Sequence, residues 1–227
     1  MPTITDLRGP AGRLEALLDT PEPASVRAAV VFAHPHPQHG GTMHTKVVYQ
    51  GAKALTRIGC AVLRFNFRGV GASEGAFDRG EGEQADFAAA LDHMAGRYPG
   101  VPLWAAGFSF GSWVALEVGA LDPRVSVLIG IAPPVVTSVS GQAYTFEHTL
   151  QSTKAKFFVQ GEADEVCPLE GLWQFYGRLH EPKEMAVIDG ASHAVAFVGA
   201  ALGTRSVALG VDRFGQTGSQ SELYAEY

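Results

Sequence analysis

Cysteine is scarce in this sequence: Cys60 and Cys167 are the two among 227 residues, and neither stands in a spacing typical of metal ligands. A disulfide framework is therefore not expected, and two free buried thiols in a reducing compartment are the simpler interpretation. No apolar run approaches the ~18 residues of a membrane span, and the N-terminal residues lack the apolar stretch of a secretory signal. We expect a soluble cytoplasmic protein with no membrane partner.

Positive charge is also in short supply. The formal net charge of −6 at pH 7 argues against a nucleic-acid partner, because such proteins carry an excess of Lys and Arg that neutralises phosphates. Hydrophobic residues make up 46% and charged residues 18%, a globular balance rather than a disordered one. The length favours a single domain over residues 1–227, with the polar segment 210–227 as a tail or as part of a homodimer contact.

Short apolar segments recur along the chain and alternate with amphipathic ones. Near-continuous apolar strands are typical of a parallel sheet covered on both faces, and six segments fit this description: 28–34, 60–67, 101–108, 125–132, 156–161 and 184–189. Segments with helical spacing lie between them, at 45–59, 83–98, 113–121 and 169–180. The pattern predicts an α/β fold, an open, mostly parallel twisted sheet with helices on both faces. Residues 13–19 are expected to add an antiparallel edge strand.

The segment GFSFG, residues 107–111, carries the first chemical signal. It is a G-x-S-x-G motif between an apolar strand and a helical pattern, where a tight turn lifts a strained serine above the sheet. The helix N-terminus behind Ser109 favours developing negative charge. Ser109 could instead merely cap the helix, since serine is a favoured N-cap residue. The strand before and the helix after favour a nucleophile.

A nucleophilic serine needs a base, and the base needs an orienting acid. His193 follows the last predicted strand in a loop of small residues and is the candidate base. The acid is expected in the loop after strand 156–161, where Asp164 is preferred because its short side chain loses little rotamer freedom. Glu162 is the second choice, and Asp189 a distant third.

Three segments carry a family resemblance: HPHP…GGTMH…KVV, LRFNFRGVGASEGAFD and GFSFG. Their wording and order resemble the small, lidless, serine esterase-like members of the α/β-hydrolase superfamily, over roughly residues 12–200. The resemblance implies a Ser109–His193–Asp164 triad. The serine at the turn differs from the Asp of dehalogenases and epoxide hydrolases and from the Cys of dienelactone hydrolases.

The segment HPHP, residues 34–37, is expected to form an oxyanion loop. Proline has no N–H, so the backbone N–H of His36 is the isolated donor at the loop tip, and that of Phe110 is the second donor. A metal site built from the rings of His34, His36 and His39 is the alternative. It is disfavoured because no Asp, Glu or Cys lies nearby in the sequence to complete a ligand shell.

Two further segments bear on the ligand. RGVGASEG, residues 68–75, resembles a phosphate cradle, but it fits neither G-x-G-x-x-G nor GK[ST], and Arg68 and Glu74 are expected to buttress the site instead. The connection 133–155 is too short for a cap domain, which gives a minimal cap or none and an open serine. His39, Pro134 and Val166 are guessed to line a modest acyl pocket.

The function expected from these features is that of a cofactor-free and metal-free carboxylesterase acting on small or exposed esters. Thioesterase, peptidase and feruloyl-type esterase activities use the same triad and stay open as alternatives. A non-catalytic binding module on the hydrolase fold is the alternative from another class of protein. It is disfavoured because all three triad members are present.

Overall fold

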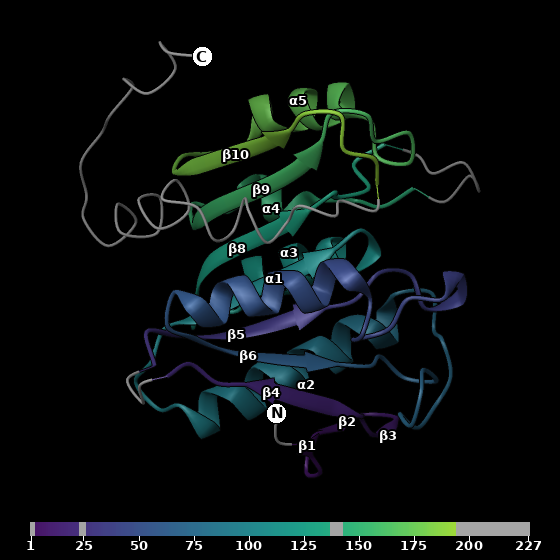
Figure 1. Cartoon of the computed structure of the whole chain (residues 1–227), viewed down its shortest axis with the longest axis vertical. Coiled ribbons are helices and arrows are strands. Elements are labelled where there is room, and N and C mark those ends of the chain that lie inside the picture. Colours follow the sequence, from purple (N-terminus) through teal and green to yellow (C-terminus); the bar gives the residue numbers. More distant parts are fainter. Residues whose placement is uncertain (1–2, 23–25, 137–142, 194–227) are drawn as a thin grey trace.

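The structure is a computed structural model that describes residues 3–22, 26–136 and 143–193. It is built around an eight-stranded sheet with the order β1-β4-β6-β5-β7-β8-β9-β10 (Figure 1). The strands are β1 (Thr3–Ile4), β4 (Ala16–Asp19), β5 (Ala28–Ala33), β6 (Cys60–Phe65), β7 (Leu103–Phe108), β8 (Val125–Ile131), β9 (Ala155–Gly161) and β10 (Lys183–Ile188). A separate ribbon pairs β2 (Arg8–Gly9) with β3 (Gly12–Arg13).

The strands from β5 to β10 are mutually parallel. Every residue of β5, β6, β7 and β9 is buried, which explains why these strands read as unbroken apolar runs rather than as alternating ones. All six predicted strands are confirmed, as is the open, mostly parallel sheet. The single-domain prediction includes residues outside the described ranges, among them 210–227, and stays a prediction.

The antiparallel strand predicted at residues 13–19 is β4, which pairs with β6 in the register Ala16↔Phe65. Its predicted place at the edge of the sheet is wrong. The short strand β1 pairs antiparallel with the outer side of β4, with Thr3 opposite Leu17. A two-residue strand has too few residues to show any periodicity, so only the backbone pairing reveals it.

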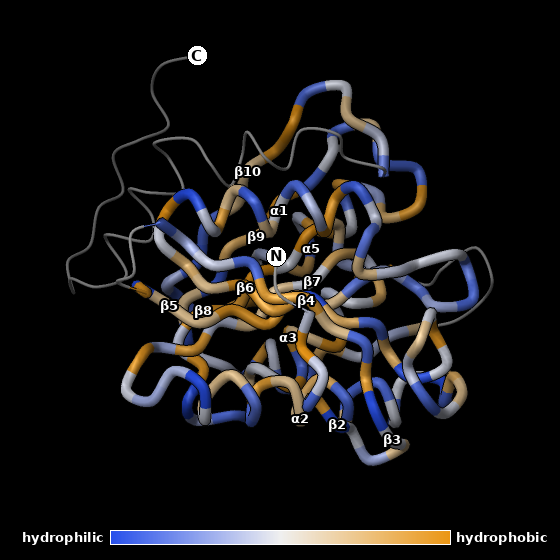
Figure 2. Tube along the Cα trace, turned by 60° about the horizontal axis from the view of Figure 1, so that its bottom comes forward, coloured by the Kyte–Doolittle hydropathy of each residue, from blue (hydrophilic) through white to orange (hydrophobic). Residues whose placement is uncertain are grey.

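Helices cover both faces of the sheet. On one face, α1 (Lys46–Arg57) packs against the core with Val47, Val48 and Leu55, and Figure 1 shows it in front of the strands. On the other face lie α2 (Glu81–Arg97), α3 (Phe110–Leu121) and α5 (Leu169–Arg178). Figure 2 shows the hydrophobic colour concentrated in the central strands and the hydrophilic colour on outer turns, as two apolar layers against one sheet require.

Two connections differ from expectation. The helix predicted over residues 45–59 spans Lys46–Arg57, and just before it Thr45 N donates to Thr42 O and closes a turn. The 3₁₀ turn η1 (Pro37–His39) was not predicted. The connection between β8 and β9 contains the short helix α4 (Glu147–Gln151) in its described part, in line with a minimal cap.

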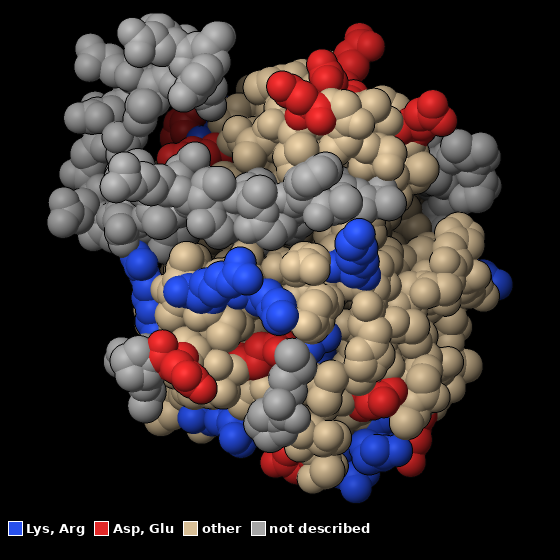
Figure 3. Space-filling model, viewed as in Figure 1, with Lys and Arg blue, Asp and Glu red and all other residues tan. Residues whose placement is uncertain are grey.

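The outward side of α1 is basic, with Lys46, Lys53 and Arg57 all exposed. Figure 3 shows Lys and Arg gathered where α1 crosses this face, with Asp and Glu toward its upper and lower parts. In the lower part of this face, further Lys and Arg side chains lie among the Asp and Glu side chains, so the two signs are mixed there (Figure 3). Among the described helices, none is long and apolar enough to cross a membrane.

The strand order determines where chemistry can take place. β5 lies between β6 and β7, and the chain leaves β5 toward α1 on one face and β7 toward α3 on the other. The connections after β5 and β7 therefore diverge at a topological switch point, which is where open α/β sheets bind ligands beyond their carboxyl ends.

Candidate active site

Ser109 lies in the sharp turn between β7 and α3. Its backbone has φ 54° and ψ −122°, a left-handed conformation that costs a non-glycine residue free energy and that clusters at functional sites. The turn is held by Ser109 N, which donates to Ile131 O at 2.8 Å, and by Ser109 O, which accepts from Ser112 N at 2.8 Å. The Ser109 side chain makes no capping hydrogen bond, so the simple N-cap interpretation is wrong.

The glycines on either side of Ser109 permit the turn. A Cβ at Gly107 would overlap the carbonyl of Gly111, and a Cβ at Gly111 would overlap the carbonyl of His34 at the end of β5. These obstacles are backbone atoms, which cannot move aside as a flexible side chain can. The G-x-S-x-G spacing is therefore a packing requirement of this turn as well as a chemical one.

Replacing Gly107 with alanine should lower the free energy of unfolding by about 3 kcal/mol or more, at the upper end of the cost of overpacking. Urea denaturation measures it. Gly177→Ala in α5 is the matched control, because nothing lies within 4 Å of a Cβ at that position; it should be neutral or stabilise by up to about 1 kcal/mol. Equal stabilities of the two variants would contradict the overlap.

The structure brings His193 to Ser109 and Asp164 to His193. Nε2 of His193 lies 3.1 Å from Ser109 Oγ, and its Nδ1 lies 2.9 Å from Asp164 Oδ2. The ring is held from beneath by Phe108, with 5.1 Å between the ring centroids. The two other candidate acids stay apart from the imidazole: Glu162 is exposed and accepts from Gly190 N at 3.0 Å, and Asp189 is exposed.

Asp164 is buried and held from two sides. Its Oδ1 accepts from the backbone N–H groups of Val166 at 2.9 Å and Cys167 at 2.8 Å, and its Oδ2 accepts from Gln160 Nε2 at 3.0 Å. These three donors fix the position of the carboxylate, and the carboxylate can in turn fix the orientation of His193.

Gln160 is a site residue that the sequence analysis missed. Besides Asp164 it donates to Cys167 O at 2.6 Å, while its own Oε1 is buried with no partner among the described residues. A buried acceptor without a partner costs about 1–3 kcal/mol of stability. Gln160 therefore carries this cost at Oε1 while its Nε2 holds Asp164 in place. A glutamine inside the apolar run KFFVQG was the available signal.

Cys167 is a free buried thiol, as the sequence predicted, but its position beside Asp164 was not predicted. It is buried, and burial raises the pKa of its thiol, with the nearby Asp164 adding to the effect. The thiol is therefore neutral near pH 7 and does not compete with Ser109 as a nucleophile, since the thiolate is the reactive form.

The loop after β5 brings His36 to the residue after the serine. The rings of His36 and Phe110 have centroids 5.0 Å apart, and His39 stacks on His36 at 4.5 Å. The loop is closed by Gly41 N, which donates to His36 O at 3.1 Å. Phe110 is the first residue of α3, so its N–H is one of the four at a helix start that have no partner within the helix.

His34 is part of the hydrogen-bonded core rather than a metal ligand. Its Nε2 accepts from Phe67 N at 3.1 Å, and its Nδ1 lies 2.6 Å from Pro35 O, so both ring nitrogens are engaged. In the described ranges, one group of three potential ligands converges, and it consists of Asp164, Cys167 and His193. The loop histidines do not form such a group. Burial lowers the pKa of His34 to about 4.

The buried His34 predicts a pH-dependent stability. Its folded pKa of about 4 lies below the unfolded value of 6.5, so its contribution is complete above pH 6.5 and is lost as the pH falls toward 4. Relative to His34→Gln, the wild type should lose about 2 kcal/mol of unfolding free energy between pH 7.5 and pH 5. Urea denaturation at both pH values measures this, and a difference between the proteins that does not change with pH would contradict it.

The charged side chains of the glycine-rich segment 68–75 are held by the surrounding fold. Arg68 donates from Nη2 and Nε to the two oxygens of Asp86 in α2, at 2.8 and 3.0 Å, and both residues are buried. Glu74 accepts from Arg13 N at 2.7 Å. The charged groups of Arg68 and Glu74 are thus engaged within the fold rather than free to hold a phosphate. Their role as a buttress of the active-site face stays a prediction.

The three guessed pocket residues all follow carboxyl ends of strands. His39 lies in η1 and is exposed, Pro134 is buried just after β8, and the Val166 side chain is 47% exposed beside Asp164. They therefore share the edge of the sheet that carries Ser109. Their role in binding an acyl group stays a prediction.

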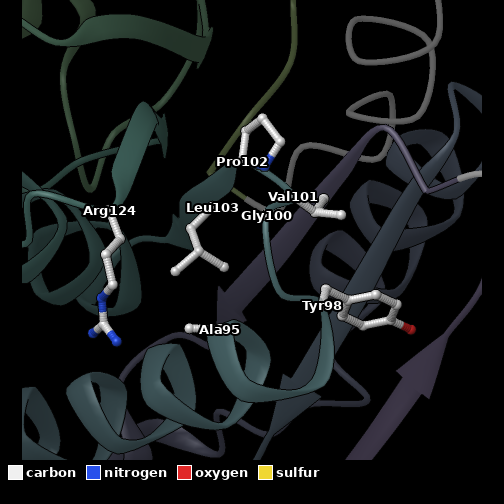
Figure 4. Close-up of a pocket in the computed structure, with 7 residues that line it drawn as sticks. All are labelled: Ala95, Tyr98, Gly100, Val101, Pro102, Leu103 and Arg124. Atoms are coloured by element: carbon white, nitrogen blue, oxygen red, sulfur yellow. The ribbon is translucent and has the colours of Figure 1, made fainter.

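A cavity of about 450 Å³ lies at the opposite, amino-terminal edge of the sheet (Figure 4). It is lined by Ala95 near the end of α2, by residues 98 and 100–103 that follow, and by Arg124. Arg124 Nη2 is already paired with Asp92 at 2.7 Å and with Asp122 at 2.5 Å. The cavity therefore lies at the edge of the sheet opposite to Ser109. The Arg124 guanidinium that lines it is already paired with two carboxylates.

Comparisons with known proteins agree with this geometry. A family model described as serine aminopeptidase, S33, matches residues 24–158, which is more than half of the chain. The chain is 36% identical over 199 residues to the uncharacterized protein RP471 of Rickettsia prowazekii (strain Madrid E), covering 85% of this chain and 82% of that protein.

Two solved structures are similar over nearly their whole length. An α/β serine hydrolase homologue from Coxiella burnetii is 37% identical, with a TM-score of 0.81 over 91% of this chain and 97% of that one. XC6422 from Xanthomonas campestris, described as an α/β serine hydrolase without a lid, is 34% identical, with a TM-score of 0.81 over 94% of each chain. With the sheet order, the strained serine turn and these matches together, the chain belongs to the α/β-hydrolase superfamily and, within it, to the serine hydrolases.

Proposed function

We propose that this protein is a carboxylesterase that cleaves small or exposed esters through an acyl-serine intermediate. The observation that carries the proposal is the relay from Ser109 Oγ to His193 Nε2 at 3.1 Å and from His193 Nδ1 to Asp164 Oδ2 at 2.9 Å. Each step has the length of a hydrogen bond. The order of nucleophile, base and orienting acid is the one that acyl transfer to a serine requires.

In the acylation half, Ser109 Oγ attacks the ester carbonyl while its proton passes to His193 Nε2. Asp164 stays ionised, holds the Nδ1–H of the ring and stabilises the imidazolium that forms. The tetrahedral intermediate then collapses, the bond to the alcohol breaks, and His193 returns the proton to the departing alcohol oxygen. The acyl group remains on Ser109.

In the deacylation half, water takes the place of the alcohol. His193 removes a proton from the water, whose oxygen attacks the acyl carbonyl, and the proton is then given to Ser109 Oγ as the acid leaves. Charge on the carbonyl oxygen is stabilised in both halves by the N–H groups of Phe110 and His36. Loss of one such donor typically costs about 3–4 kcal/mol of transition-state stabilisation.

The preference for small or exposed esters rests on the connection between β8 and β9. Residues 132–154 form this connection, whose helix α4 spans five residues, and so short a segment cannot enclose a long acyl chain as a cap domain does. The exposed side chain of Val166 beside Asp164 and the partly exposed His193 also support an open site.

A panel of substrates tests the proposal with purified protein. We expect kcat/KM to be highest for p-nitrophenyl acetate and butyrate and to fall by about ten-fold or more for the octanoate, a difference of 1.4 kcal/mol or more. Turnover of an aminoacyl anilide, an acyl-coenzyme A thioester or methyl ferulate in place of the short esters would favour the corresponding alternative. Failure of the protein to turn over any of these compounds would favour the binding module.

A further inference from the structure

The proposed mechanism assigns no role to the thiol of Cys167, which lies beside Asp164 and His193. The Sγ of Cys167, a carboxylate oxygen of Asp164 and a ring nitrogen of His193 all lie within 4.8 Å of one another. The first two residues are 2% and 4% exposed, while the imidazole is 23% exposed. Thiolate, imidazole and carboxylate are the three ligand types that Zn²⁺ binds in proteins.

The distances are close to those of a metal site. A tetrahedral zinc ion with bonds of 2.0–2.3 Å holds its ligand atoms about 3.4–3.6 Å apart. The Asp164 and His193 atoms are 2.9 Å apart, and Sγ is at most 4.8 Å from either. A movement of about 1 Å by the thiol, with a slight parting of the other two, would complete the triangle.

We propose that Asp164, Cys167 and His193 form an inhibitory binding site for a thiophilic divalent cation such as Zn²⁺. Nδ1 of His193 faces Asp164, so it is the nitrogen that a shared ion takes. At 2.9 Å there is room for a proton between the nitrogen and the oxygen but not for an ion. Binding of the ion and the Asp164–His193 hydrogen bond therefore exclude each other.

Binding of the ion changes the protonation of two of its three ligands. The Cys167 thiol gives its proton to solvent when sulfur binds the ion, Asp164 binds as the carboxylate it already is, and the Nδ1 proton of His193 moves to Nε2. A ring protonated at Nε2 donates to Ser109 Oγ and cannot accept its proton. The inhibition rests on the proposed esterase function, whereas the binding of the ion does not.

Cys60 provides a matched control, because it is a second buried thiol on β6 and does not belong to the group of converging ligands. Wild type, Cys60→Ala and Cys167→Ala are titrated with Cd²⁺, and the ultraviolet charge-transfer band of a Cd²⁺–thiolate bond is recorded. We expect one ion per chain and the band in wild type and in Cys60→Ala. In Cys167→Ala the band should be lost.

Zn²⁺ inhibition is measured on p-nitrophenyl acetate, with each protein compared with its own metal-free rate. The half-inhibiting Zn²⁺ concentration should rise at least about ten-fold in Cys167→Ala. Loss of a residue that only hydrogen-bonds to a metal ligand already lowers metal affinity by about ten-fold or more, and here a ligand itself is lost. His193→Ala, at a partly exposed position, should weaken Cd²⁺ binding by a similar factor and serves if Cys167→Ala does not fold.

Absence of the band in wild type at excess Cd²⁺, or equal Zn²⁺ sensitivity of wild type and Cys167→Ala, would overturn the proposal. If no protein hydrolyses the ester but the band appears and depends on Cys167, the metal site stands and the proposed function fails.

Discussion

Ser109→Ala should lower kcat for p-nitrophenyl acetate by on the order of 10⁶-fold, the loss typical of removing the nucleophile from such a triad. The hydroxyl that attacks is gone, and His193 Nε2, which lies 3.1 Å from it, has no oxygen to deprotonate. A remainder of about 10³-fold over the uncatalysed reaction should persist, because the oxyanion donors and the binding surface are untouched. Stopped-flow and long-incubation assays together cover this range.

Ser126→Ala is the matched control for this variant. Ser126 is an exposed serine near the start of β8, at the opposite edge of the sheet, and its Oγ donates to Leu103 O at 3.3 Å. Its replacement should leave kcat unchanged. Full activity in Ser109→Ala would remove the nucleophile from the account.

Asp164→Asn should lower kcat by about 10⁴-fold. The N–H groups of Val166 and Cys167 both point at Oδ1, so they hold the amide oxygen of the new asparagine there and turn its NH₂ toward His193. Nδ1 must then accept rather than donate, which places the ring proton on Nε2, facing Ser109. A base that already carries its proton cannot take another from the serine.

Glu162→Gln tests which carboxylate is the acid of the triad, since the sequence offered both Asp164 and Glu162 for this role. Glu162 is exposed, and its contact is with Gly190 N at 3.0 Å, an acceptor role that glutamine can keep. We expect kcat to change less than about three-fold, well under 1 kcal/mol. A loss near 10⁴-fold in Glu162→Gln, with activity kept in Asp164→Asn, would reverse the assignment of the acid.

The parallel part of the sheet was predictable from the sequence because burial on both faces leaves a local signature. Strands such as β5 and β9 are buried at every residue, and each is followed by a helical pattern. The pairing of β1 with β4 was not predictable, since two residues carry no period. The η1 turn was also missed, because the prolines of this loop were used only to decide which residues keep a backbone N–H. They were not used to predict the conformation of the loop.

Two residues of the candidate active site were predictable, because the order of strands and helices places a nucleophile and a base at defined points along the chain. Ser109 lies in the G-x-S-x-G motif that directly joins an apolar strand to a helical pattern, and His193 follows the last described strand, so both could be identified without coordinates. The contacts that hold Asp164 were not predictable. Gln160 at the end of β9 donates to Asp164 through its side chain, and Cys167 donates to it through its backbone N–H. Both contacts depend on the path of the loop after β9, which no hydrophobic periodicity predicts.

The most direct test of the triad is the mass of the intact protein after reaction with a fluorophosphonate, followed by mapping of the modified peptide. We predict one phosphonyl group per chain, located on Ser109, in the wild type. The adduct should be absent from Ser109→Ala and should form much more slowly in Asp164→Asn. An unmodified wild type, or an adduct on another residue, would contradict the account.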